Sequence, residues 1–444
     1  MIADTAGRMG DPPTVRLLAA EAAGLRFADL PRDAVTIVGL CLLDTLGVAL
    51  AGRDEPVVRL IREEFAGAGD AALWGGGRTD PQTAALVNGS AAHVLDFDDY
   101  APGSGLHPSA PLVPALWSAA AVAGREVTGR DLVTAYVAGY ETQERLGLVL
   151  WPSHYDRGFH TTGTAGTIGA AAAAAHLLGA DEETTAAALG LAATDAAGVK
   201  AMFGSMGKAY HAGRAAEAGL RAARLAVRGM TVGRDALFGD QGFVAASSSA
   251  SDLGAALTPF GEPWHVLDVL PKLYPSCFGT HAAIRCALEL HPALDPAGVR
   301  EVTLTVPPVL RDVCAIAAPA TGLEGKFSLA HTTAVALLDG RITPSSFTDE
   351  RVRATGGLGA RVRLEYDDRI ARTSTVLRIV LDDGRVLSAE SDAADRPWSH
   401  APEQMRPRIE EKTRALVPAA DRLIAALRDL PDAPVLPDLP EVSP

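Results

Sequence analysis

The sequence predicts a mainly α protein with a large all-helical domain and a smaller α/β lid domain. Alanine and leucine dominate the 444 residues, while aromatic residues make up only 5%, which favours helices that pack through small side chains. The first 270 residues show no alternation of strands with helices. Strand-like patterns concentrate after about residue 300, and they indicate the second domain.

The helical domain is expected to cover residues 1–270 and to be rejoined by residues 400–430. Residues 12–52 predict two helices, and the second has a Pro/Asp start and a glycine stop. Alanine or glycine occupies most positions from 212 to 223, which would permit very close helix contact. Further helices are expected at 81–97, 108–125, 129–150, 163–179 with an antiparallel partner directly after it, and 212–229.

Residues 271–399 predict the lid domain. The segments REVTLTVPP and RVRLEYDD alternate as half-buried strands do, and Asp383-Gly384 predicts a tight hairpin between two further strands. Helices are expected between the strands, in HAAIRCALELH and FSLAHTTAVALLDG. The Pro-rich tail at 431–444 is expected to be disordered.

Charge and composition exclude several classes of protein. The net charge is −14 and no basic stripe is present, which argues against binding nucleic acid or an anionic membrane. No signal peptide is expected, and Asp44 interrupts the longest apolar stretch before it reaches the ~18 residues of a membrane span. The cysteines show no CxxC pairing and predict reduced thiols in a cytoplasmic protein: Cys41, Cys277, Cys286 and Cys314.

Lysine is scarce: only five of the 40 basic residues are lysine, and the rest are arginine. A lysine that persists against this bias indicates a position where a compact ammonium is required and a guanidinium does not fit. Chance is the alternative, and it carries more weight for Lys200, Lys326 and Lys412 than for Lys208 and Lys272.

The segment HVLDFDDY, from His93 to Tyr100, places three aspartates close to a histidine. Clustered carboxylates suit a Mg²⁺ site, and a carboxylate can also orient a catalytic histidine. Helix-end capping by Asp98 and Asp99 is the structural alternative. No second acidic cluster at metal-ligand spacing accompanies it, so we expect no metal.

Two histidines are expected at helix N-termini, where free N–H groups attract anions. His107 precedes Pro108, which favours a helix start, and an exposed loop histidine is the alternative. His160 lies among small and hydroxylated residues before an Ala-rich helix. A histidine near neutral pKa can take or give protons, so both positions suit a carboxylate substrate.

Three further segments carry candidate site residues. Lys208, His211 and Arg214 lie three residues apart at a helix start, where they could bind a polyanion together, although Arg214 could be purely structural. Lys208 could also act as a general base if it is desolvated. The other candidates are Lys272, Cys277 and His281 in one turn, and His331 on a later helix. Serine hydrolase, P-loop, zincin and Rossmann signatures are absent.

Seven segments together resemble the MmgE/PrpD family, and they run in family order from about residue 10 to 400. They are LVNGSAAHVLDFDD, HPSAPLVPAL, GYETQERLG, GFHTTGTAGTIGAAAAAAHLLG, MGKAYHAGRAAEAG, KLYPSCFGTHAAI and KFSLAHTTAVALLDG. The resemblance implies a helical domain with a lid, a homodimer, and chemistry without a metal or organic cofactor. Family members include 2-methylcitrate dehydratase, cis-aconitate decarboxylase and iminodisuccinate epimerase, which act on acids with two or more carboxylates through carbanion or enolate-like centres.

The resemblance implies a pocket at Asp96, His107, His160, Lys208 and Lys272, with His281 nearby. The sequence departs from the decarboxylase pattern at two positions. It has Tyr100 where the pattern has threonine, and Cys277 where the pattern has histidine. At His331 the decarboxylase and the dehydratases tend to carry tyrosine, and the spacing from Asp96 to His107 is one residue longer than in the decarboxylase. These departures argue against cis-aconitate as the substrate.

The sequence therefore predicts a cofactor-independent lyase that acts by proton transfer next to a carboxylate of a small polycarboxylic acid. Dehydration is the first choice, epimerisation or isomerisation of a dicarboxylate the second and decarboxylation the third; an inert ligand-binding protein is the alternative of another class. Either His160 or Lys208 is the base. The expected catalytic residues are Asp96, His107, His160 and Lys208, and the expected substrate-binding residues are Lys272, His281, His211, Arg214, Tyr100, Cys277 and His331.

Overall fold

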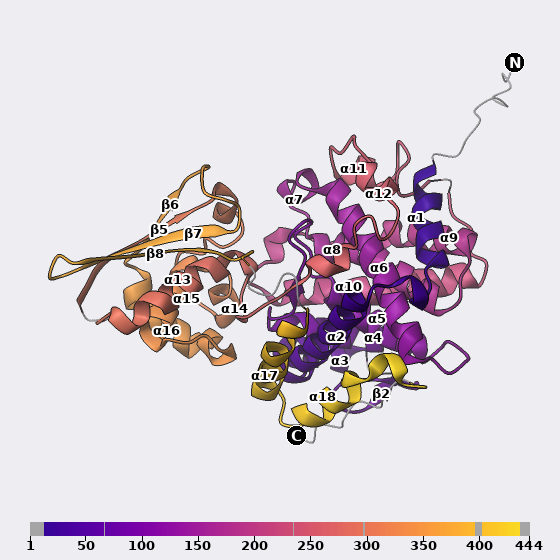
Figure 1. The fold of residues 1–444 in the computed structure, drawn as a ribbon, viewed down its shortest axis with the longest axis horizontal. Helices are drawn as coiled ribbons and strands as arrows, with labels where there is room; N and C mark the ends of the chain where they lie inside the picture. Colours follow the sequence, from indigo (N-terminus) through magenta and orange to yellow (C-terminus); the bar gives the residue numbers. More distant parts are fainter. Residues whose placement is uncertain (1–12, 66, 234, 296–297, 396–401, 436–444) are drawn as a thin grey trace, which may run out of the picture.

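The computed structural model describes residues 13–435 except 66, 234, 296–297 and 396–401. Figure 1 shows a large helical domain, indigo to magenta, beside a smaller lid that combines a sheet with helices. The predicted fold class, mainly α with a small α/β domain, is confirmed.

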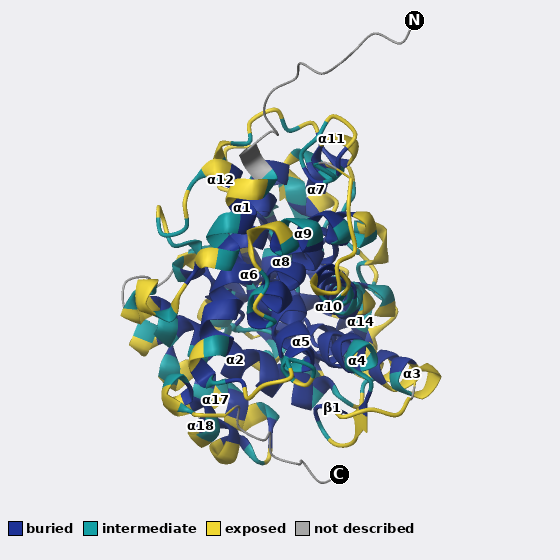
Figure 2. Ribbon diagram, turned by 90° about the vertical axis from the view of Figure 1, so that its right-hand side faces the viewer, coloured by how far each residue is buried: buried dark blue, intermediate teal, exposed yellow. Residues whose placement is uncertain are grey.

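The helical domain is built around helices that are largely buried. Figure 2 shows α5, α6, α8 and α10 in dark blue at its centre. Two short antiparallel ribbons join its loops: β1 (Ala71–Ala72) with β2 (Arg78–Thr79), and β3 (Asp99–Tyr100) with β4 (Leu270–Pro271). The helices are α1 (Pro13–Gly24), α2 (Arg32–Gly52), α3 (Pro56–Glu64), α4 (Pro81–Val94), α5 (Ser109–Ala120), α6 (Gly129–Leu150), α7 (Ser153–Asp156), α8 (Thr161–Leu177), α9 (Glu182–Asp195), α10 (Met206–Val227), α11 (Phe243–Ser247) and α12 (Gly254–Leu257).

Small residues let α10 approach its neighbours closely, as its sequence predicts. A Cβ added to Gly219 would lie 2.7 Å from the backbone oxygen of Thr167 on α8. A Cβ added to Gly213 would lie 2.3 Å from the backbone oxygen of Leu86 on α4. These contacts hold the N-terminal turns of α8 and α10 beside the end of α4, where the candidate site lies.

The last helices return to the first domain. Helices α17 (Arg406–Leu416) and α18 (Ala420–Arg428) pack against α2. Helix α2 is long and apolar enough to span a membrane, but 78% of its apolar window is buried inside the protein, and its Asp44 pairs with Lys412 on α17 at 2.7 Å. It is therefore built as a core helix.

The tail that we expected to be disordered begins differently. Residues 430–432 form a 3-10 turn, Leu430 is buried, and the carbonyl of Ala433 accepts a hydrogen bond from the Gly129 amide. Only the part at 436–444 lies outside the described residues. The tail is anchored at its start because that turn packs on the first turn of α6.

The lid contains a four-stranded sheet in the order β6-β5-β7-β8: β5 (Val299–Val306), β6 (Val362–Tyr366), β7 (Ser374–Leu381) and β8 (Val386–Asp392). Strands β5 and β6 are parallel, and β7 and β8 form the predicted hairpin with Gly384 at a φ of 86°. Figure 1 shows helices on one side of the sheet: α13 (His281–Leu290), α15 (Leu329–Asp339) and α16 (Asp349–Gly359). Helix α14 (Gly322–Gly325) is a single turn.

The close contact between α10 and α8 leads to a stability prediction. The substitution Gly219→Ala should lower the free energy of unfolding by about 1–3 kcal/mol, because the new methyl meets backbone atoms that cannot move aside. Gly39→Ala on α2 is the matched control, since its Cβ would meet nothing within 4 Å and alanine favours a helix by about 0.5–1 kcal/mol. Urea denaturation measures both, and equal effects of the two substitutions would contradict the packing described here.

Candidate active site

The site is built on the turn that follows α4, from Leu95 to Asp98. Asp96 adopts a φ of 52°, in the left-handed region that aspartate tolerates better than most residues. Three consecutive carbonyl groups of this turn accept hydrogen bonds from lysine ammonium groups, which suits the negative end of a helix. The pairs are Leu95 with Lys326 (2.7 Å), Asp96 with Lys272 (3.1 Å) and Phe97 with Lys412.

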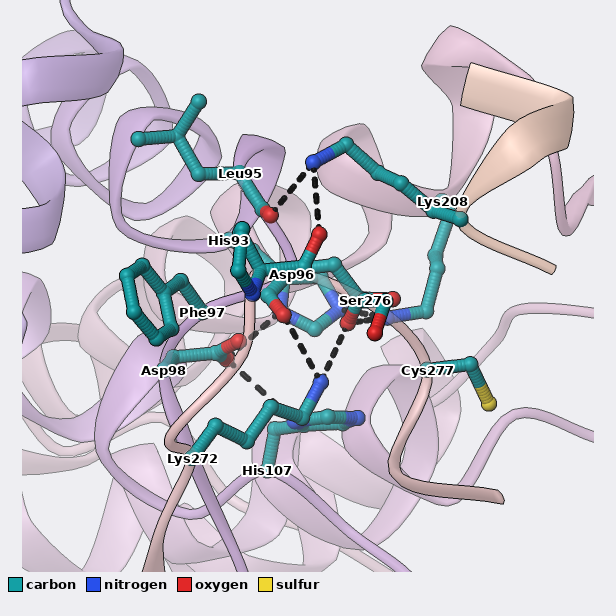
Figure 3. A network of polar contacts seen from close by, with 12 residues as sticks. His93, Leu95, Asp96, Phe97, Asp98, His107, Lys208, Lys272, Ser276 and Cys277 are labelled. Atoms are coloured by element: carbon teal, nitrogen blue, oxygen red, sulfur yellow. Dashed lines mark hydrogen bonds and ion pairs between the residues drawn. The ribbon is translucent and has the colours of Figure 1, made fainter. Parts of the chain in front are cut away.

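The Asp96 carboxylate lies between two buried lysines (Figure 3). Its Oδ1 accepts from Lys208 at 2.8 Å and from Lys272 at 2.5 Å. Burial alone would raise the pKa of Asp96, but the charges of the two lysines outweigh it and hold the pKa well below its usual value. Burial lowers and the charge of Asp96 raises the pKa of Lys272, and the net shift is upward. Asp96 is therefore a carboxylate and Lys272 an ammonium at neutral pH.

The histidine next to the three aspartates, His93, was not among the predicted site residues, and it lies behind Lys208. His93 Nδ1 is 2.6 Å from Asp98 Oδ2, and its Nε2 is 3.0 Å from Lys208 Nζ. The ring must donate from Nδ1 to the carboxylate if its Nε2 accepts from the ammonium. Burial, above all, lowers the pKa of His93, so the ring is neutral. Asp98 and His93 thereby fix the direction of the Lys208 side chain.

His107 and His160 lie where the sequence predicts them, directly before the first turns of α5 and α8. His107 Nδ1 lies 2.8 Å from the Asp99 carbonyl, which can only accept, so Nδ1 carries the proton and Nε2 is an acceptor. His160 Nδ1 is 3.1 Å from His211 Nδ1. Burial first, and then the lysine charges, lower the pKa of both His107 and His160 well below the usual value, so both rings are neutral.

One pocket brings five of the eleven predicted site residues together. Its wall includes Tyr100, His107, His160, Lys208 and Cys277. The Tyr100 ring stacks on Phe278 at 4.2 Å between centroids. Cys277 interacts with the Cys314 thiol, whose hydrogen bond is the main cause of a lowered Cys277 pKa. All four cysteines are free thiols, as the sequence predicts. The two positions that depart most clearly from the decarboxylase pattern, Tyr100 and Cys277, thus face the pocket.

Other predicted residues surround the pocket without forming its wall. Lys272 is fully buried against Asp96, and His281 lies behind it with its pKa lowered to about 3, chiefly by burial. His211 reaches the site through its Nδ1, which lies 3.1 Å from His160 Nδ1.

Two predicted site residues are placed elsewhere. Arg214 pairs with Glu217, because two steps of three residues rotate it by about 120° around α10 from the direction of Lys208. His331 bonds Thr355 through Nδ1 (2.8 Å) and the Ser346 carbonyl through Nε2 (2.9 Å), inside the lid. These contacts direct both side chains away from the pocket, and that they bind substrate stays a prediction that the contacts do not favour.

A metal could in principle find ligands here. One ligand atom from each of His93, Asp96, Asp98 and His107 lies within 4.8 Å of the others. The ammonium groups of Lys208 and Lys272 already occupy one side of the Asp96 carboxylate, however, and a metal cation bound at the same carboxylate would be repelled by them. The donor set therefore fits two lysines better than a metal.

Comparison with known proteins identifies the chain. The model of the MmgE/PrpD N-terminal domain matches residues 16–256, and the model of the MmgE/PrpD C-terminal domain matches residues 274–425. The protein belongs to the MmgE/PrpD family. Family membership supports a lyase-type activity, while the substrate and the reaction are separate questions.

Relatives of this family member match between 73% and 95% of its length. A cis-aconitate decarboxylase of Homo sapiens is 28% identical and covers 95% of this chain and 94% of its own. A cis-aconitate decarboxylase of Mus musculus is 29% identical, with 89% and 86% covered. The cis-aconitate decarboxylase-like protein oryM of Aspergillus oryzae is 29% identical over 73% of both chains.

The neutral buried histidines lead to a prediction about pH. His281 has a folded-state pKa of about 3, so between pH 3 and 6.5 the unfolded chain binds a proton that the folded protein does not. The fold therefore loses stability as the pH falls below 6.5, because only the unfolded chain gains the proton. By pH 5 this loss amounts to about 2 kcal/mol. His281→Asn should reduce the drop in melting temperature between pH 7 and pH 5.

Tyr274→Phe is the control, since the Tyr274 ring packs on His281 but carries no proton that titrates in this range. It should keep the wild-type difference between the two pH values. An unchanged difference in His281→Asn would show that this ring is not held neutral by the fold.

Proposed function

We propose that this protein is a lyase that moves a proton at a carbon next to a carboxylate of an acid with two or more carboxylates, using side chains alone. The observation that carries the proposal is the pocket in which a buried ammonium and two neutral imidazoles face one space: Lys208, His107 and His160. An ammonium suits a carboxylate or an enolate oxygen, and a neutral imidazole can accept or donate a proton.

We assign Lys208 the role of stabilising negative charge on the substrate, and we do not assign it proton transfer. Two of its three N–H groups are directed to Asp96 and His93, which leaves one for the substrate. Its Nζ lies 2.8 Å from Asp96 Oδ1, the distance of a charge-assisted hydrogen bond. A fixed ammonium stabilises the negative charge that develops when the neighbouring carbon loses its proton.

The imidazoles are assigned to proton transfer. His107 presents Nε2 as an acceptor, because its Nδ1 donates to the Asp99 carbonyl. His160 Nε2 is buried and has no hydrogen-bond partner among the described residues. If the His211 Nδ1 proton points at His160 Nδ1, then His160 Nε2 carries its own proton and faces the substrate as a donor. One ring then serves as base and the other as acid.

Dehydration uses both groups, which is why we favour a hydro-lyase. The base takes the proton from carbon, the bond from the neighbouring carbon to the hydroxyl oxygen breaks, and the acid protonates that oxygen as water leaves. Decarboxylation is the second candidate, because the relatives carry that activity in their names. The positions of Tyr100 and Cys277 in the pocket wall favour a substrate other than cis-aconitate.

The experiment is proton NMR in D₂O with a panel of hydroxy, unsaturated and amino acids that carry two or three carboxylates. A vinylic signal that appears or disappears would identify a hydro-lyase, and a product with one carboxylate fewer would identify a decarboxylase. Deuterium incorporated next to a carboxylate without net conversion would indicate an epimerase or isomerase. Ligand binding with neither exchange nor conversion of any acid would favour an inert binding protein and contradict the proposal.

Two variants separate the roles. His107→Gln should reduce the rate of proton exchange by about 10²–10⁴-fold while substrate binding persists. Lys208→Met should weaken binding of the carboxylate as well as the rate. Full exchange in both variants would contradict the assignment. The homodimer implied by the family is a further expectation, and sedimentation equilibrium measures it.

A further inference from the structure

The pocket is not uniformly polar, and this contrast bears on the substrate. Lys208, His107 and His160 form its buried end. Rings and aliphatic side chains form much of the remaining wall: Trp151, Phe203, Phe278, Leu310, Val313 and Phe327. Some come from the helical domain and others from the lid, so the apolar wall exists only where the two domains meet.

We propose that the substrate is a dicarboxylic acid with an apolar substituent, whose alkyl or aryl group lies against this wall. The proposal rests on the proposed function, and it narrows the substrate class for the same site. An apolar group gains about 0.8 kcal/mol per buried methylene, whereas a third carboxylate placed there would lose its water without gaining a partner.

The charges that face the pocket support two carboxylates and not three. Among the described residues, the ammonium of Lys208 and the guanidinium of Arg372 are the cationic groups in its wall. Lys272 and Asp96 are paired behind the wall, and the imidazoles of His107 and His160 are neutral. One cation is available for each of two carboxylates.

Arg372 marks the open end of the pocket. It lies in the segment that leads into β7 of the lid, it is exposed, and its guanidinium carbon is 4.3 Å from the centre of the Trp151 ring. Lys208 is only 5% exposed, so one cation lies at the buried end of the pocket and the other at its open end. A dicarboxylate can meet Lys208 with one carboxylate while its other carboxylate lies toward Arg372 and its substituent contacts the rings.

The test measures binding of unreactive saturated acids to the full-length protein by isothermal titration calorimetry. The probes are succinate, methylsuccinate, butylsuccinate and phenylsuccinate, with propane-1,2,3-tricarboxylate as the highly charged comparison. Binding should tighten by about three- to fourfold per methylene along the alkyl series. Butylsuccinate should bind at least tenfold more tightly than the tricarboxylate.

A substitution in the apolar wall tests whether the substituent of the ligand binds there. Val313→Trp, which fills space in the apolar wall, should weaken butylsuccinate binding by at least tenfold and change succinate binding by less than twofold. Val309→Phe is the second variant in the same wall, in case the first fails to fold. Val232→Trp, at an exposed valine outside this pocket, is the matched control and should leave both affinities unchanged.

The outcomes separate this inference from the proposed function. If deuterium exchange next to a carboxylate occurs but affinity does not rise with chain length, or the tricarboxylate binds more tightly, the inference is overturned and the lyase proposal stands. If no acid binds or exchanges, both fail. Affinity that rises with chain length in the wild type but not in Val313→Trp supports the inference.

Discussion

The turn from Leu95 to Asp98 is held by four lysines, three of them buried, and the site depends on this arrangement. The lysines come from α10, from the segment after β4, from the end of α14 in the lid and from α17: Lys208, Lys272, Lys326 and Lys412. Segments far apart in the sequence are thereby joined to the C-terminal end of one helix. The negative end of α4 and the Asp96 carboxylate supply the charge that makes four ammonium groups tolerable there.

This arrangement connects the two domains to the chemistry. Lys326 bridges the Leu95 carbonyl and the Pro275 carbonyl, so the lid and the helical domain meet at the same turn that carries Asp96. Burial, above all, lowers the pKa of Lys326 to about 8. The same concentration of positive charge in a buried space helps to keep His107 and His160 neutral, which is the state that proton transfer requires. In the proposed function, Asp96 is a positioning residue, since it acts through the lysines that it contacts.

Part of this could be predicted from the sequence. Helix starts at His107 and His160 follow from local signals, and scarce lysine pointed to Lys208 and Lys272 as positions that require an ammonium. Lys326 and Lys412 received less weight, because the lysine bias alone does not separate a required ammonium from chance. The role of Asp98 as the partner of His93 could not be separated from helix capping, since both uses leave the same residues at the same spacing.

Other features depend on tertiary contacts. The lid helix α16 was missed because DERVRATGGLG carries a glycine pair that weakens the helical pattern, and its Thr348 cap is visible only in three dimensions. Arg372 and the apolar wall of the pocket come from segments that share no motif and meet only when the lid lies on the helical domain. His331 stands within a family-like segment, but its ring is directed into the lid, which the segment alone does not indicate.

The central claim is that the Asp96 carboxylate and the buried lysines form one interacting unit, and a double-mutant cycle of Asp96→Asn and Lys272→Met tests it most directly. Urea denaturation gives the free energy of unfolding of each variant and of the pair. Each single substitution should cost about 3–5 kcal/mol, because it takes from a buried charge one of the partners that compensate it. The double variant should cost at least about 1 kcal/mol less than the sum. Strictly additive losses would contradict the account, since they would mean that the two groups do not depend on each other.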